Sequence, residues 1–247
     1  MINDKVCFFN NNKEQITIIN NKAYIYNRTY MNNIPLELLG IGVDGVVYKY
    51  KDKAIKLYHD NKYVKEHLTK EQINILTTYN TKHIVLPKES LTSTDINPGF
   101  IMNYINLEQE KDLSIEPKKV IINEIKEMEQ ELMFLGQNHF LLNDSNTDNL
   151  FYNGNLYLFD PDSFLYDAKA NFTRRNIEIF VWYFIRDIIF SLKNGYSKQE
   201  QLANIRRLNY LYKKADYQLL SNLLENLQED ENLNQAANNF INKKLKR

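Results

Sequence analysis

A cluster of glycines near the start of the chain limits what this sequence can form locally. Gly40, Gly42 and Gly45 are three of only seven glycines in the 247-residue chain. The residues after Gly45 are β-branched and aromatic, and Lys53–Tyr58 alternates in polarity as a strand does. In a dinucleotide-binding fold a helix would open directly after such glycines, whereas here a strand follows. The pattern therefore predicts a glycine-rich β-hairpin followed by a strand that carries Lys56.

This hairpin has two possible roles, and its own residues do not decide between them. Glycines at the tip let backbone N–H groups approach phosphate oxygens with no Cβ in the way. The ammonium group of Lys56 would then supply a positive charge for the same phosphates. Alternatively, the segment is an ordinary hairpin and Lys56 faces the solvent.

Composition excludes several classes of protein. The chain has 31 basic and 31 acidic residues, so no net charge attracts nucleic acid or an anionic membrane, and we expect neither as a partner. Cys7 is the only cysteine, which excludes internal disulfides and fits a reducing compartment. The first residues lack the basic region and long apolar core of a signal peptide. We therefore expect a cytoplasmic protein.

The chain changes character after about its first hundred residues. The strand-like segments are residues 5–9, 15–19, 23–26, 36–39, 46–50, 53–58 and 99–105. Apolar residues recur at helical spacing over 62–79, from Pro117 to a stop at Gly136, and over 177–192. We therefore expect an α+β fold with domains at 1–103 and 104–247. The strands before residue 30 either cover a sheet or bind a partner.

An acidic, amide-rich segment lies between the two long helices. Asn153-Gly154 is a strong turn signal, which predicts a hairpin between residues 150–152 and 156–159. Its outer ends should bring Asn149 and Asp160 close enough to share a cation, and their amide and carboxylate oxygens suit Mg²⁺. The alternative is that these side chains simply cap turns.

Taken in order, these segments resemble the motifs of the protein kinase superfamily. The glycines with Val47 are similar to the G-x-G-x-x-G-x-V loop of that family. Ala54-Ile55-Lys56 resembles the A-I-K motif of its third strand. The other matches are Glu71 with the helix-C glutamate, Met102, Asn103 and Tyr104 with the gatekeeper and hinge, Asp144 and Asn149 with the D-x-x-x-x-N loop, and Asp160 with the aspartate of D-F-G. The likeness covers residues 36–193. It implies a bilobal fold with a β-rich N-lobe and a mostly helical C-lobe.

The resemblance also implies transfer of a phosphoryl group from ATP, with Mg²⁺, to a hydroxyl of a protein or small molecule. Lys56, held by Glu71, would bind the α- and β-phosphates, and Asp144 would accept the hydroxyl proton. The metal ligands would be Asn149 and Asp160, with Asp162 as an additional carboxylate. Adenine would lie between Val47 and Ala54, with its edge bonded to the backbone from Asn103 to Ile105.

Departures from the family pattern leave the acceptor open. Asn143 replaces the arginine before the catalytic aspartate, and Asn146 replaces the lysine two residues after it. Pro161 follows Asp160, and we expect it to hold Asp160 in extended geometry. Only residues 163–175 precede the next helix, too few for the usual peptide-docking segment. We favour an atypical Ser/Thr protein kinase; the alternatives are a small-molecule kinase similar to aminoglycoside or choline kinases, and a nucleotide-binding pseudokinase.

Overall fold

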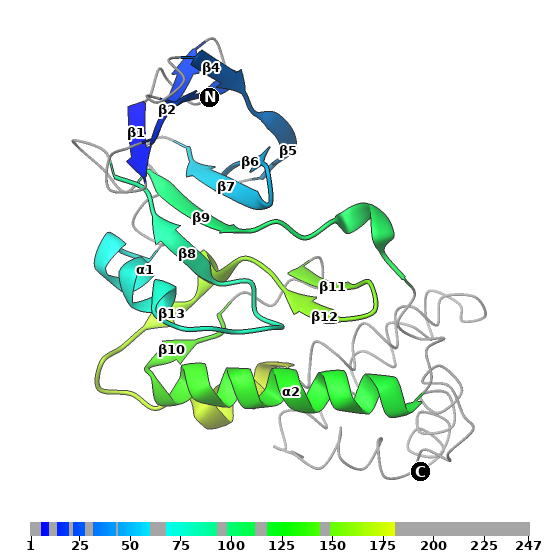
Figure 1. The fold of residues 1–247 in the computed structure, drawn as a ribbon. Coiled ribbons are helices and arrows are strands. Elements are labelled where there is room, and N and C mark those ends of the chain that lie inside the picture. Colours follow the sequence, from blue (N-terminus) through cyan, green and yellow to red (C-terminus); the bar gives the residue numbers. More distant parts are fainter. Residues whose placement is uncertain are drawn as a thin grey trace, which may run out of the picture. The chain divides into compact units, whose positions relative to one another are not determined.

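The computed structural model describes residues 6–9, 14–19, 22–27, 32–42, 44–59, 68–92, 98–111, 118–143 and 149–180 (Figure 1). The chain divides into two compact units. The first comprises Met1–Asn106 with Phe159–Tyr166, and the second comprises Leu107–Leu158 with Asp167–Arg247. The segment Phe159–Tyr166, which we expected within the helical domain, therefore belongs to the first unit.

An antiparallel five-stranded sheet forms the framework of the first unit, in the order β5-β6-β7-β9-β8. Its strands are β5 (Glu37–Ile41), β6 (Gly45–Tyr50), β7 (Lys53–Tyr58), β8 (Pro87–Ser90) and β9 (Gly99–Asn103). The glycine-rich hairpin and the strand that carries Lys56 are thus confirmed as β5, β6 and β7. Strand β8 was not predicted, because its sequence, Pro-Lys-Glu-Ser, has neither β-branched residues nor an alternating pattern.

A second, four-stranded sheet contains β1 (Val6–Phe9), β2 (Glu14–Ile19), β3 (Lys22–Asn27) and β4 (Asn32–Pro35), in that order. Its fully buried Ile16, Ile18 and Ile25 share one hydrophobic cluster with Tyr48 and Leu57 of the five-stranded sheet. The N-terminal strands therefore cover one face of that sheet, which answers the question that the sequence left open.

Helix α1 (Lys70–Thr77) begins where its backbone N–H groups find side-chain partners. Thr69 and Gln72 form a capping box, in which each side chain accepts a hydrogen bond from the other's backbone N–H. Ile73 and Leu76 are buried beneath the helix. The predicted helical stripe began at residue 62, and residues 62–67 lie outside the described part of the chain.

The second unit contains the long helix α2 (Lys118–Gln137), with a stripe of completely buried side chains at Ile125, Met128, Leu132 and Leu135. The helix ends at Gln137, one residue after the predicted stop at Gly136, and the glycine itself has a steric role. A Cβ on Gly136 would lie 2.3 Å from the backbone nitrogen of Thr173, so only glycine allows this close packing.

The predicted hairpin of the second unit is also present. It consists of β11 (Leu150–Tyr152) and β12 (Leu156–Leu158), and Gly154 adopts a φ of 116° in the turn. Residues 173–180 are helical, while the rest of the predicted 177–192 helix lies outside the described residues.

The remaining short elements are η2 (Leu107–Gln109), β10 (Phe140–Leu141), η5 (Pro161–Ser163) and β13 (Leu165–Tyr166). The antiparallel sheets together with α1 and α2 confirm the α+β class over the described residues. Among these residues, no helix has both the length and the apolar character needed to cross a membrane.

Candidate functional site

One face of the five-stranded sheet carries several of the residues predicted to bind nucleotide. Residues directly opposite each other in neighbouring strands point to the same side of a sheet. Val47 lies opposite Lys56, and Ala54 lies opposite Met102. Tyr48 and Leu57 alternate with them and point into the core beneath the N-terminal sheet. The register therefore gathers Val47, Ala54, Lys56 and Met102 on the face turned away from that core.

Lys56 forms an ion pair with Asp160, a residue 104 positions later in the chain. The lysine Nζ donates a hydrogen bond to Oδ1 of the aspartate. The lysine side chain is only 8% exposed and that of the aspartate 29%. Burying an unpaired ammonium group is unfavourable in free energy. The carboxylate of Asp160 offsets part of this desolvation penalty at Lys56. The structure thus brings together the predicted phosphate-binding lysine and a predicted metal ligand.

Asp160 adopts a left-handed backbone conformation, with φ 65° and ψ 52°. Our expectation of extended geometry before Pro161 was therefore wrong. Aspartate is among the few residues with a side chain that enter this region readily. The carbonyl of Asp160 accepts hydrogen bonds from the backbone N–H of Ser163 at 3.1 Å and from its hydroxyl at 2.8 Å. These bonds and the ion pair hold Asp160 in the left-handed conformation, although a residue before proline usually prefers an extended one.

The three glycines of the β5–β6 hairpin differ in how much space a side chain would have at each position. A Cβ on Gly45 would lie 2.3 Å from the carbonyl oxygen of Leu57, so Gly45 is needed for the pairing of β6 with β7. At Gly42 the nearest atom would be 3.8 Å away, and at Gly40 no described atom lies within 4 Å. Neither Gly40 nor Gly42 has a positive φ. The fold therefore requires Gly45, whereas open space surrounds the other two.

Glu71 does not pair with Lys56, which corrects the expectation from the sequence. It is exposed in the first turn of α1. Hydrogen bonds from its own backbone N–H and from Thr69 lower the pKa of its carboxyl group. A carboxylate at a helix N-terminus is stabilised by the unpaired N–H groups there, and this local attraction explains its position. Asp160 contacts Lys56 instead.

The predicted hinge begins in the last residues of β9, and Tyr104, directly after the strand, already contacts other parts of the protein. The backbone N–H of Tyr104 donates a hydrogen bond to the carbonyl of Asp52 at 3.0 Å. The Nζ of Lys49 lies 4.3 Å from the centre of the Tyr104 ring, a cation–π contact. Because the Tyr104 N–H is occupied, a ligand edge would have to use the backbone of Asn103 or Ile105.

The structure describes only some of the remaining predicted catalytic and metal-binding residues. Asp144 lies outside the described residues, and so does the side chain of Asp162, whose backbone belongs to η5. Asn149 is half-buried and directly precedes β11 in the second unit. The catalytic role of Asp144 and the metal-binding roles of Asn149 and Asp162 stay predictions.

Asn176, which we did not predict, anchors the segment that leads into the predicted catalytic loop. Its buried side-chain amide donates to the carbonyls of Leu132 and Phe140 at 3.0 and 2.9 Å, and accepts from the N–H of Leu142 at 2.8 Å. The only signal for it in the sequence is an amide residue at the start of a strongly apolar helix. Asn176 thus fixes the backbone directly before Asn143.

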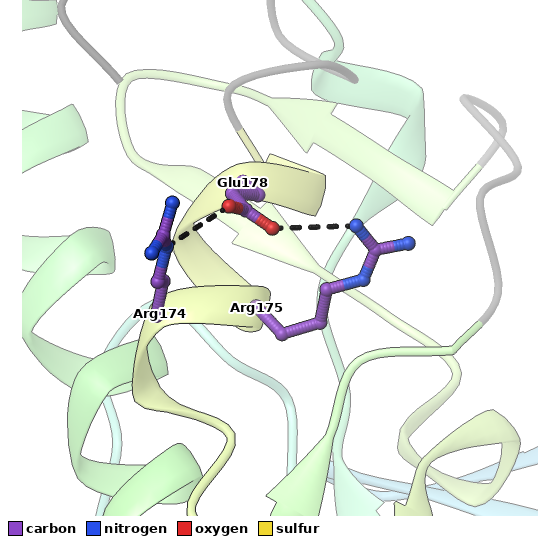
Figure 2. Close-up of polar contacts among 3 residues, drawn as sticks. All are labelled: Arg174, Arg175 and Glu178. Carbon is purple, nitrogen blue, oxygen red and sulfur yellow. Dashed lines mark hydrogen bonds and ion pairs between the residues drawn. The ribbon is translucent and has the colours of Figure 1, made fainter. Parts of the chain in front are cut away.

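The same helix carries two arginines that share one carboxylate (Figure 2). Arg174 Nε lies 3.2 Å from Glu178 Oε1, and Arg175 Nη1 lies 3.3 Å from Glu178 Oε2. Both arginine side chains are more than half exposed, at 68% and 55%. Exposed pairs of this kind contribute about 0.2–1 kcal/mol each.

Comparison with known proteins gives a likeness to solved structures alone. No family model matches the chain, and no curated protein matches it. Among solved structures, the chain is similar to the Legionella pneumophila kinase Lpg2603 bound to IP6. The identity is 16%, the match covers 96% of this chain and 93% of that chain, and the TM-score is 0.42. A likeness at this level carries no argument about function, which has to rest on the residues themselves.

Proposed function

We propose that this protein is a phosphotransferase that uses ATP and Mg²⁺ to phosphorylate a hydroxyl group. The observation that carries the proposal is the ion pair between Lys56 and Asp160, on the sheet that contains the glycine-rich hairpin. Catalysis of phosphoryl transfer consists mainly of positioning and charge neutralisation. A lysine for the phosphates and a carboxylate for the metal serve one triphosphate, so they have to be neighbours.

In this proposal each predicted site residue has a defined task. Lys56 would bind the α- and β-phosphates, and Asp160, which contacts Lys56 in the structure, would also bind the metal. Mg²⁺ would be held by Asp160 together with Asn149 and Asp162, whose amide and carboxylate oxygens suit this ion. When bound, the metal supplies positive charge that offsets the charge of the phosphates.

The open space at Gly40 and Gly42 supports the placement of the phosphates under the hairpin. A side chain at these positions would narrow the space for a phosphate, while the N–H of Gly42 itself donates to the carbonyl of Gly45 at 2.8 Å. Val47, Ala54 and Met102 would then form the apolar surface against the adenine, and Asp144 would accept the proton of the attacking hydroxyl.

We further propose that the acceptor is a Ser or Thr hydroxyl of a protein, because the Gly-rich loop and the A-I-K motif follow the protein-kinase pattern. One observation favours a small-molecule acceptor instead. The helix after η5 already begins at residue 173, so the segment that docks peptides in protein kinases is short. Both alternatives use the same nucleotide site.

Incubation with γ-labelled ATP and Mg²⁺, with and without lysate of the host, tests the proposal. We expect label on a protein band; label on a small molecule would identify the alternative acceptor. Lys56→Met and Asp144→Asn should each remove labelling, while Lys53→Met, on the same strand but the opposite face, should retain it. A folded wild-type protein that binds ATP without any transfer would be a pseudokinase, and one that binds no ATP would contradict the proposal.

A further inference from the structure

The glycine-rich hairpin is tied to the end of β7 by a single histidine. His59 directly follows β7, and its ring Nε2 lies 3.0 Å from the carbonyl oxygen of Gly42. The backbone N–H of His59 also donates to the carbonyl of Asp44 at 2.9 Å. Residues on both sides of the hairpin tip, Gly42 and Asp44, are therefore bonded to the residue that follows the strand of Lys56.

The hydrogen-bond partner of the ring indicates which ring nitrogen carries a hydrogen. A carbonyl oxygen can only accept, so Nε2 must carry the proton that His59 shares with Gly42. Within the described part of the chain, the other ring nitrogen, Nδ1, is buried without a hydrogen-bond partner. An unpaired buried nitrogen is unfavourable, and an apolar side chain would fill the same place without that disadvantage. The bond to Gly42 is thus the one polar interaction in the described structure that this ring makes.

The position of the Gly42 carbonyl matters in a loop that binds phosphate. Such a loop attracts phosphate oxygens through its N–H groups, whereas a carbonyl oxygen facing them would repel them. The His59 ring engages the carbonyl of Gly42, the glycine where open space leaves room for a ligand. Without that bond the carbonyl would be free to turn toward the phosphates.

We propose that His59 is a positioning residue of the nucleotide site: its Nε2–H holds the Gly42 carbonyl and thereby sets the glycine-rich hairpin for phosphate binding. The inference rests on the proposed function, because it assumes that ATP occupies this hairpin. His59 acts through Gly42 and touches neither the acceptor nor the transferred group. Its loss should therefore raise the KM for ATP and change kcat little.

Two pairs of variants test this role. His59→Leu and His59→Asn remove the donor at the Nε2 position, because the shorter Asn amide reaches only the place of Nδ1. His59→Gln restores it, since its amide nitrogen extends as far as Nε2. We expect His59→Leu and His59→Asn to raise the KM for ATP about threefold to tenfold, as the loss of one hydrogen bond predicts, and His59→Gln to lie close to the wild type.

Two further measurements separate the possible failures. The ¹⁵N NMR signals of the wild-type ring should show a proton on Nε2, which tests the Gly42 bond without any activity assay. ATP binding by the wild type tests the proposed function by itself. If the wild type binds ATP and His59→Leu lowers only the urea midpoint, with its KM unchanged, then His59 has a purely structural role and the inference is wrong. A proton on Nδ1 alone would also overturn it.

Discussion

Lys56 and Asp160 contact each other through Nζ and Oδ1, although one lies in the middle of a sheet and the other precedes a short 3₁₀ turn 104 residues later. The contact lies within a single compact unit, because Phe159–Tyr166 belongs with Met1–Asn106. The lysine side chain is 8% exposed and the aspartate side chain 29%. In the proposed function the former binds the triphosphate and the latter its metal.

This pair should behave as a unit in catalysis. Lys56→Met and Asp160→Asn should each lower kcat/KM about 10²–10³-fold, as the loss of one preorganised electrostatic partner does. The double variant should be only slightly worse than either single one, since residues that act together give strongly non-additive losses. Initial rates with γ-labelled ATP measure all three values. Losses that multiply would mean that the two residues act independently.

Replacing each hairpin glycine by alanine should distinguish the glycine that is needed for stability from those that are needed for ATP binding. Gly40→Ala and Gly42→Ala should leave the free energy of unfolding unchanged or raise it by about 0.4–1 kcal/mol, because open space and ordinary backbone angles accept a methyl group. Both should weaken ATP binding, because the new methyl group lies where phosphates approach.

Gly45→Ala is the matched comparison. Its Cβ would clash with the carbonyl of Leu57, so we expect destabilisation by about 1–3 kcal/mol. Urea denaturation and ATP titration of the three variants provide both quantities. Equal ATP affinity in wild type, Gly40→Ala and Gly42→Ala would argue against a phosphate beneath the hairpin.

The elements that could be predicted from the sequence are those with a strong local pattern. Strand β6 is rich in β-branched and aromatic residues, β7 alternates in polarity, α2 repeats its apolar residues at helical spacing, and Asn153-Gly154 specifies its own turn. Strands β4 and β8 were missed because their sequences, Asn-Asn-Ile-Pro and Pro-Lys-Glu-Ser, carry little strand preference. They are strands because a neighbouring strand pairs with them.

The sequence indicated which residues belong to the candidate site better than it indicated which of them contact each other. Motif order pointed to Lys56 and Asp160, yet we assigned the lysine to Glu71. The partner of a lysine depends on long-range packing, while Glu71 is held by the N-terminus of its own helix. The left-handed Asp160 illustrates the same limit, since tertiary contacts override the preference of a residue before proline.

Asn176 should be essential for stability although it lies outside the motifs. Asn176→Ala would remove the hydrogen bonds that this buried side chain makes with the carbonyls of Leu132 and Phe140 and with the N–H of Leu142, so we expect a loss of about 2–4 kcal/mol. Asn176→Asp keeps the acceptor for Leu142 but sets a carboxylate against the carbonyls of Leu132 and Phe140, and should also be destabilising. Chemical denaturation measures both losses. An Asp variant as stable as the wild type would show that the two carbonyl contacts contribute nothing.

The half-buried Glu129 on α2 should make stability depend on pH. Burial raises the pKa of its carboxyl group, and the nearby charge of Lys126 only partly opposes this effect. A raised pKa means that the folded state binds the proton more tightly than the unfolded state. The stabilising contribution is therefore complete below the unfolded pKa and is lost as pH rises through the folded pKa.

Glu129→Gln stays neutral at every pH and avoids that loss. Its urea midpoint should match the wild type near pH 4 and exceed it increasingly toward pH 7. Glu110→Gln, at an exposed position of the same unit, is the control for replacing a glutamate by glutamine. If the difference between Glu129→Gln and wild type is constant across this range, the carboxyl group ionises equally easily in the folded and unfolded chains, and burial on α2 does not hold its proton.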